Sequence, residues 1–139
     1  MNKNTNRHIK SQEQFGRQAH CYTESLAHSS GESLHLIQEW TANDRCNLAV
    51  DIGTGAGFTA FAIALHVDRV LATDITIAML IEARSIAKRR GVTNVIYTLA
   101  AAECLPFPDD SMELLTCRTA AHHFHDISKA ITEWSRVLA

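Results

Sequence analysis

The stretch "AVDIGTGAGFTAFAIAL" at residues 49–65 decides the fold, because it begins as an apolar strand and ends as an apolar helix. Gly53, Gly55 and Gly57 occupy every second position where the two elements meet. Main-chain N–H groups and a helix N-terminus converge at such a turn, and glycines leave room for a ligand to touch the backbone. A tight turn explains any one glycine alone, but the alternating set of three indicates a ligand site.

The rest of the chain alternates between short apolar strands and amphipathic helices. We expect strands at residues 48–52, 69–73, 92–99 and 112–117, and helices at residues 31–40, 57–66, 77–90 and 128–138. Strands separated by helices of this size form right-handed βαβ units. The sequence therefore predicts an α/β fold, a three-layer, Rossmann-like open parallel sheet with about four strands.

The apolar spacing within the helices also predicts which residues face the core. The residues expected to point inward are Leu34, Ile37 and Trp40 in the first helix, Ile77, Leu80 and Ile81 in the third, and Phe124 and Trp134 near the end of the chain. Thr76 is expected to cap the third helix, and Gly91 to end it after a basic last turn.

Composition limits the class of protein. The chain has 139 residues, 46% hydrophobic and 20% charged, which suits one globular domain. A formal net charge of -2 gives no long-range attraction for nucleic acid or an anionic membrane, and no apolar run is long enough to cross a bilayer. We expect a cytoplasmic protein. The four cysteines, Cys21, Cys46, Cys104 and Cys117, lie far apart and suggest neither a zinc site nor a disulfide framework.

The residues around the glycines narrow the choice of ligand. A dinucleotide motif would place its third glycine where Phe58 stands, and a nucleotide triphosphate loop needs a lysine that residues 53–69 lack. Instead Asp51 lies two residues before Gly53, where its carboxylate could face a cationic ligand group. Asp74 ends the second strand, where α/β sheets bind ribose hydroxyls with a carboxylate. The alternative is that Asp74 binds no ligand and is a solvated acid at the end of the strand or forms a hydrogen bond within its own turn.

Four segments together resemble one enzyme family. They are "DIGTGAG" at 51–57, "TDITIAML" at 73–80, "AAECLPFPDDSMELLTCRTAAHHFHD" at 101–126 and "EWSRVLA" at 133–139. The set is similar to class I S-adenosylmethionine-dependent methyltransferases of the ubiquinone/menaquinone-biosynthesis type (methyltransferase type 11-like), from about residue 15 to 139. The resemblance implies methyl transfer from S-adenosylmethionine to a small-molecule acceptor.

By this resemblance, Asp51 and the backbone of the glycine turn hold the methionine part of the cofactor, Asp74 binds the ribose diol, and Ile75 flanks the adenine. Relatives commonly have an aspartate where this chain has Ala101, so one side-chain contact to the adenine is lost while the backbone amide of Ala102 remains. The implied cofactor-binding residues are Asp51, Gly53, Thr54, Gly55, Gly57, Asp74, Ile75, Ala101, Ala102, Glu103, Cys117 and Arg118.

Three histidines, His122, His123 and His125, crowd four residues. Imidazoles ligate metals or act as bases near neutral pH, but no nearby cysteine or second histidine pair completes a metal site, so we expect none. The resemblance places this segment beside the acceptor pocket. It assigns His123 a possible catalytic role in positioning the acceptor or removing its proton.

The resemblance also divides the chain. Residues 1–30, with "QFGRQAHCYTES" at 14–25, resemble a segment that covers the cofactor, and residues 31–139 resemble the cofactor-binding part of the domain.

Relatives continue into a fifth strand, so we expect the C-terminal part to be lacking and "MELLTC" to form an exposed apolar edge. We therefore expect a homodimer or other self-association. The alternative function is an inactive cofactor-binding or structural remnant that associates through this edge.

Overall fold

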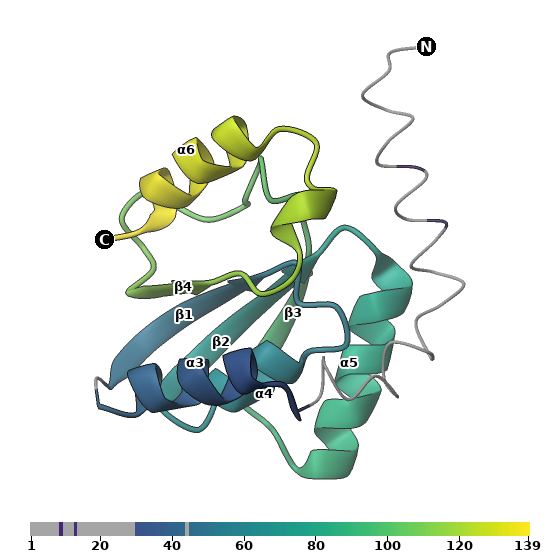
Figure 1. The fold of residues 1–139 in the computed structure, drawn as a ribbon, viewed down its shortest axis with the longest axis vertical. Coiled ribbons are helices and arrows are strands. Elements are labelled where there is room, and N and C mark those ends of the chain that lie inside the picture. Colours follow the sequence, from purple (N-terminus) through teal and green to yellow (C-terminus); the bar gives the residue numbers. More distant parts are fainter. Residues whose placement is uncertain (1–8, 10–12, 14–29, 44) are drawn as a thin grey trace.

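The structure is a computed structural model, and it describes residues 9, 13, 30–43 and 45–139 (Figure 1). The predicted covering segment at residues 1–30 lies almost entirely outside the described residues, and so does its motif at 14–25.

The described chain alternates between helices and strands as predicted. Its helices are α3 (Glu32–Ala42), α4 (Phe58–Ile63), α5 (Ile77–Arg90) and α6 (Ile127–Val137), with a short 3-10 helix η1 (Ala121–His123). Its strands are β1 (Cys46–Ile52), β2 (Val67–Asp74), β3 (Val95–Leu99) and β4 (Leu114–Thr116). They form one parallel sheet in the order β3-β2-β1-β4. The predicted α/β fold with four parallel strands is confirmed.

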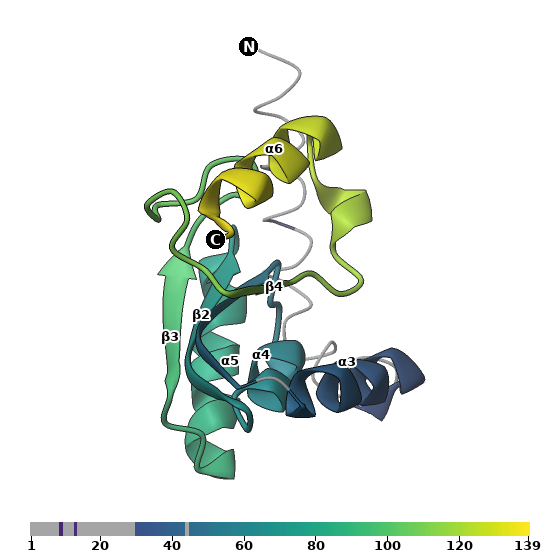
Figure 2. The same cartoon turned by 90° about the vertical axis from the view of Figure 1, so that its left-hand side faces the viewer.

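Side chains of β1 alternate between two apolar clusters, which makes the fold three layers deep. Ala49 packs with Ala60 and Ile63 of α4, whereas Val50 belongs to a cluster that contains Ala130 of α6. Figures 1 and 2 show α6 on one side of the sheet and α3, α4 and α5 on the other. The central strand is thus buried on both faces, as its continuous apolar sequence predicts.

The inward assignments of three large apolar residues are wrong. Trp40, Ile77 and Ile81 have exposed fractions of 71%, 63% and 64%. The buried residues of α5 are instead Met79, Leu80, Ala83, Ile86 and Ala87. The small alanines on this face let the helix approach the sheet closely, which turns the two isoleucines outward. In α3 the buried residues are Leu34 and Thr41.

The start of α5 also differs from the prediction. Thr76 is the N-cap residue, but its side chain makes no capping hydrogen bond. The carboxylate of Asp74 instead fixes the N-cap residue itself, because its Oδ1 accepts the Thr76 backbone N–H at 2.9 Å. Gly91 ends the helix in a left-handed conformation with φ of 71°, as predicted.

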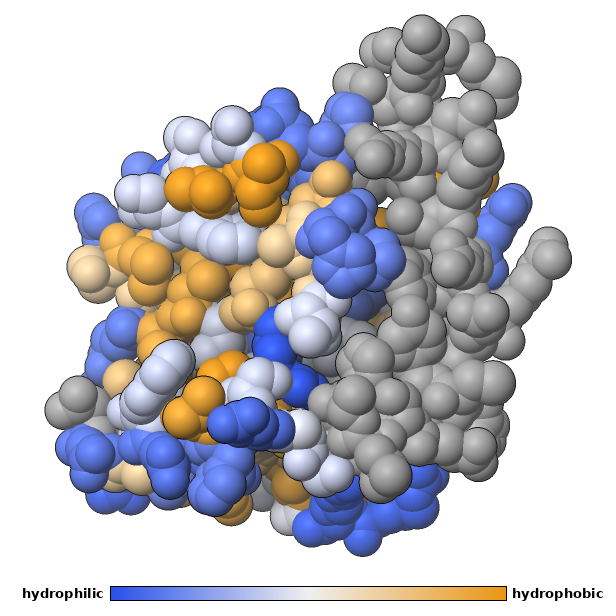
Figure 3. Space-filling model, in the orientation of Figure 1, coloured by the Kyte–Doolittle hydropathy of each residue, from blue (hydrophilic) through white to orange (hydrophobic). Residues whose placement is uncertain are grey.

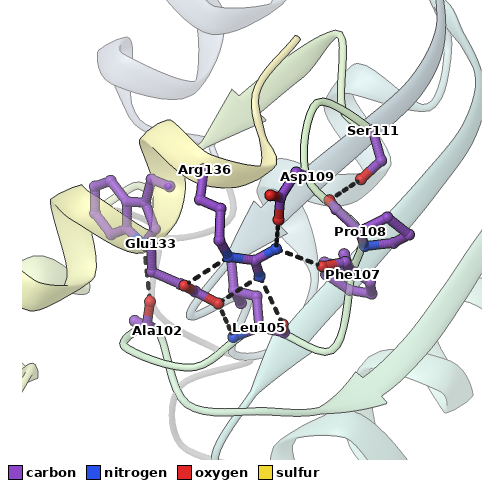
Figure 4. Close-up of polar contacts among 9 residues, drawn as sticks. Ala102, Leu105, Phe107, Pro108, Asp109, Ser111, Glu133 and Arg136 are labelled. Carbon is purple, nitrogen blue, oxygen red and sulfur yellow. Dashed lines mark hydrogen bonds and ion pairs between the residues drawn. The ribbon is translucent and has the colours of Figure 1, made fainter.

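The segment between β3 and β4 is a loop that α6 holds against the sheet (Figure 4). Glu133 accepts the Leu105 N–H at 2.7 Å, and the guanidinium of Arg136 donates to the carbonyls of Leu105 and Phe107 at 3.1 and 2.9 Å. Arg136 also contacts Asp109 at 2.6 Å. The hydrogen bond from Arg136 lowers the pKa of Glu133 to about 2. The loop is therefore pinned by charge-assisted hydrogen bonds.

The predicted fourth strand is shorter than expected, and Met112, its expected first residue, pairs instead with backbone after α6. Met112 donates to the Val137 carbonyl at 2.8 Å and accepts the Ala139 N–H at 2.9 Å. The Met112 side chain is 1% exposed.

Among the described residues, no helix is long and apolar enough to span a lipid bilayer.

Candidate functional site

The carboxyl ends of the four strands surround a cavity of about 360 Å³. The turns after β1, β2 and β4 and the segment after β3 line it. The lining residues are Gly53, Thr54, Gly55, Ala56, Phe58, Thr59, Asp74, Ile75, Met79, Ala100, Ala102, Glu103, Arg118, Thr119, Ala120, His122, His123 and Phe124. Parallel strands bring their ends to the same edge of a sheet, which is where open α/β folds bind ligands. The predicted site residues missing from this lining are Asp51, Gly57, Ala101 and Cys117.

The three glycines of the turn are required for different reasons. All have positive φ, at 63°, 54° and 89° for Gly53, Gly55 and Gly57. A Cβ on Gly53 would lie 2.6 Å from the Ala120 Cβ, and one on Gly57 would lie 2.5 Å from the Phe61 ring. Only at Gly55 is the space open, with Met79 at 4.0 Å. Ligand approach therefore does not explain all three glycines, since the protein's own packing excludes side chains at two of them.

Asp51 lies beneath the turn, so the expectation that its carboxylate faces a cationic ligand group does not fit its position. The residue is 1% exposed. Its two oxygens accept the hydroxyls of Thr54 at 2.6 Å and Thr116 at 2.8 Å. Burial raises the pKa of Asp51 to about 6, although both hydroxyls oppose the shift. The carboxylate thus connects β1, the glycine turn and β4.

Asp74 lines the cavity at the end of β2. Its Oδ2 accepts the Gly55 N–H and its Oδ1 accepts the Thr76 N–H, each at 2.9 Å. Burial raises the pKa of this carboxyl, while the backbone hydrogen bonds act in the opposite direction. Each carboxylate oxygen can accept a further hydrogen bond, so the local turn bonds and a role toward ligand hydroxyls are compatible.

Arg118 follows β4 and lines the cavity, and its guanidinium contacts two helices. Its Nε donates to Thr59 of α4 at 3.0 Å, and its Nη1 donates to Ser33 of α3 at 3.2 Å. The neighbouring Cys117 has a pKa raised to about 12 by burial and by the charge of Asp51. Its thiol is therefore protonated at neutral pH and is not a nucleophile.

The segment after β4 supplies the histidines. The rings of His122 and His123 are 3.8 Å apart between centroids, and both line the cavity. Burial and the neighbouring His122 lower the pKa of His123, which favours the neutral imidazole. Glu103 holds the following loop, because its Oε1 accepts the backbone N–H groups of His125 at 2.8 Å and Asp126 at 3.2 Å.

Several contributors escaped the sequence analysis. Thr116 binds Asp51 across 65 positions of sequence, and no local pattern indicates such a pairing. Thr119 lines the cavity with φ of 55°, a conformation that a β-branched residue rarely adopts.

In the described part of the chain, no three His, Cys, Asp or Glu side chains gather closely enough to hold a metal ion.

Comparison with known proteins identifies the family. A family model described as a methyltransferase domain matches residues 50–139. The chain belongs to this methyltransferase family. The match begins in β1 and extends through α6, so the methyltransferase domain includes every strand of the sheet. Family membership implies S-adenosylmethionine as the cofactor.

Individual relatives agree with this assignment. The chain is 44% identical over 125 residues to the uncharacterized methyltransferase YcgJ of Bacillus subtilis (strain 168), covering 89% of this chain and 49% of YcgJ. It is 34% identical over 96 residues to the ubiquinone/menaquinone biosynthesis C-methyltransferase UbiE of Rickettsia massiliae (strain Mtu5), covering 64% and 39%. The chain thus spans about half or less of these relatives.

Solved structures share the fold. The crystal structure of Bacillus subtilis YcgJ superposes with a TM-score of 0.72 at 47% identity, covering 76% of this chain and 45% of that one. The crystal structure of a SAM-dependent methyltransferase from Aquifex aeolicus gives a TM-score of 0.70 at 20% identity, covering 83% of this chain and 62% of that one. The second likeness concerns the fold alone.

The methyltransferase domain has a cavity that fits this cofactor chemically. Asp74 offers a carboxylate for vicinal hydroxyls, and Gly55 leaves open space above the backbone. Ile75, Met79 and Ala102 add apolar surface that suits a nucleobase. A volume of about 360 Å³ is in the range of small-molecule sites.

Gly53→Ala tests whether packing accounts for the first glycine. Gly91→Ala is the matched control, because Gly91 also has positive φ (71°) but no atom within 4 Å of its would-be Cβ. We expect Gly91→Ala to lower the free energy of unfolding by about 1–2 kcal/mol. Gly53→Ala should cost a further 1–3 kcal/mol, roughly, because of the clash with Ala120. Equal losses in urea unfolding would contradict this explanation.

The raised pKa of Asp51 predicts how stability depends on pH. Since this pKa rises from 3.8 to about 6 on folding, the folded state holds the proton more tightly. The free energy of unfolding should therefore fall as the pH increases from about 4 to about 6, and Asp51 should add no further change above that window.

Asp51→Asn should remove up to about 3 kcal/mol of this decline, as measured by urea unfolding at several pH values. Some slope should remain, because the pKa of Asp74 is raised in the same direction. Asp68→Asn, at the exposed start of β2, controls for the loss of one carboxylate. A decline of the wild-type size in Asp51→Asn would show that Asp51 does not titrate in this window.

Proposed function

We propose that this domain binds S-adenosylmethionine in the cavity and takes part in transferring its methyl group to a small-molecule acceptor. The observation that carries the proposal is the Asp74 carboxylate, which lines the cavity and is fixed by the Gly55 backbone N–H. An acid held against the glycine turn suits a ligand with a diol and a polar tail. The name of UbiE, a C-methyltransferase of quinone biosynthesis, supports an acceptor of small-molecule class.

In this proposal Asp74 accepts hydrogen bonds from the ribose hydroxyls, and Ile75 and Ala102 flank the adenine. The glycine turn, with Thr54, and the backbone at Cys117 and Arg118 hold the methionine end. The family's aspartate is replaced by Ala101, so binding should be weaker by about one hydrogen bond, on the order of 1 kcal/mol. Asp51 contributes by holding Thr54 and Thr116 in place.

When bound, S-adenosylmethionine supplies a methyl group on a positive sulfur, which is already a good electrophile. The residues of this chain hold the reactants and exclude water, so no nucleophile is required. His123 is proposed to orient the acceptor or accept its proton, since burial favours the neutral ring and the ring lines the cavity. Only the neutral imidazole has a nitrogen that can accept a proton, so the lowered pKa of His123 suits this role.

The alternative function, an inactive remnant, is not favoured by the family match. Self-association through β4 stays a prediction. It is supported by the hydrophobic surface that Figure 3 shows around the positions of α6 and β4. Ile127 and Ile131 of α6 are 43% and 54% exposed. Met112, however, is covered by backbone from residues 137–139. A cytoplasmic location likewise stays a prediction.

Asp74→Ala tests the binding proposal by calorimetry with S-adenosylhomocysteine. We expect at least a tenfold loss of affinity, about 1.4 kcal/mol, because the ribose loses its acceptor. Asp68→Ala, at the other end of the same strand, is the matched control and should bind as the wild type does. Circular dichroism checks that both variants fold, since Asp74 also holds Gly55 and Thr76. Equal affinities in all three proteins would contradict the assignment of Asp74.

A further inference from the structure

Glu103 is an acid in the cavity lining to which the proposed function gives no contact with the cofactor. It comes directly after Ala102 in the loop that follows β3, and the residue is 8% exposed. Its Oε1 accepts two backbone N–H groups, from His125 at 2.8 Å and from Asp126 at 3.2 Å. The carboxylate therefore links the loop after β3 to the segment after β4.

The two N–H groups that Glu103 accepts lie at the start of α6. Asp126 is the N-cap residue of this helix, and its own side chain accepts the Lys129 N–H at 3.0 Å. The N–H groups at this end of a helix have no partner within it, and the helix N-terminus carries a partial positive charge. A carboxylate satisfies both conditions, so charge-assisted hydrogen bonds fix the place where α6 begins.

The histidine segment, residues 120–125, lies between this anchor and the glycine turn. At its start Ala120 packs so tightly on the turn that a Cβ on Gly53 would lie 2.6 Å from the Ala120 Cβ. Within it the His123 N–H donates to the Ala120 carbonyl at 2.9 Å, a bond internal to the segment. Its end is held by the carboxylate of Glu103.

The position of the His123 ring depends on that end of the histidine segment. The ring lines the cavity and lies 3.8 Å, between centroids, from the ring of His122. His123 is only two residues from His125, whose N–H is the nearer of the two that Glu103 accepts. So short a piece of chain cannot absorb a displacement of its anchor, so loss of Glu103 should move the ring relative to the cavity.

We propose that Glu103 is a positioning residue for methyl transfer, because it fixes the histidine segment so that His123 faces the acceptor. This inference rests on the proposed function, since His123 has an acceptor to orient only if the domain transfers a methyl group. The same carboxylate joins the histidine segment to Ala102, which is proposed to flank the adenine. It thereby sets the cofactor and acceptor parts of the cavity at a fixed separation.

The test is the proton affinity of the His123 ring, measured by nuclear magnetic resonance during a pH titration of the protein alone. The resonance is identified by its loss in His123→Gln. Burial and the neighbouring His122 hold the pKa of this ring below its ordinary value. Glu103→Ala should release the segment and weaken both effects. The ring should then have at least about twofold higher proton affinity than in Glu103→Gln, a pKa difference of about 0.3.

Glu103→Gln separates the anchor from the charge. It loses the same negative charge as Glu103→Ala, but its amide oxygen can still accept the two N–H groups. Loss of the charge alone should not raise the pKa of His123, because a nearby carboxylate favours the protonated ring. Glu113→Ala is the matched control, since Glu113 also accepts a backbone N–H, from Asn47 at 3.2 Å, but lies outside the cavity lining. His123 should titrate in it as in the wild type.

Glu103→Asp keeps the proposal testable if circular dichroism shows that Glu103→Ala does not fold. It retains the charge but is one methylene shorter, so it should raise the pKa of His123 above that of the wild type. The proposal is overturned if His123 titrates alike in Glu103→Ala and Glu103→Gln, or alike in Glu103→Asp and the wild type. It is also overturned if Glu113→Ala raises the pKa equally. Failure of S-adenosylhomocysteine to bind the wild type would instead count against the proposed function alone, since the titration needs no ligand.

Discussion

The buried carboxylate of Asp51 is the contact on which the site depends. It lies 1% exposed in the central strand and accepts one hydroxyl from the glycine turn and one from β4. Removing a carboxylate from water is costly, and two short hydrogen bonds offset only part of that cost, as its raised pKa of about 6 indicates. The protein keeps this charge because it joins three segments that surround the cavity.

The two sides of the sheet make different contributions to the site. On the α4 and α5 side, Asp74 holds both the glycine turn and the first turn of α5, so the acid that faces the cavity is itself fixed. On the α6 side, Glu133 and Arg136 pin the loop at residues 105–109, and the Trp134 indole donates to the Ala102 carbonyl at 3.1 Å. The cavity wall therefore depends on a helix that lies distant in sequence.

Sequence reasoning succeeded where the information is local. Apolar runs predicted all four strands. Because the glycine turn follows β1 and Asp74 ends β2, the sequence also predicted that the turn and Asp74 line the same cavity. It failed where partners are distant. The clash partner of Gly53 is Ala120, and the partner of Asp51 is Thr116, so neither could be recognised from neighbouring residues. Trp40 was misplaced because helical spacing shows which residues share a face, and tertiary packing decides whether that face is covered.

The most direct test of the site is nuclear magnetic resonance of the isotope-labelled chain titrated with S-adenosylhomocysteine. The account predicts that the amide resonances of Gly55, Ile75 and Ala102 shift together and saturate with one affinity. Those near Gly91, which ends α5 and does not line the cavity, should stay in place. Shifts confined to other parts of the chain, or no shift at millimolar ligand, would contradict a cofactor site at the carboxyl ends of the strands.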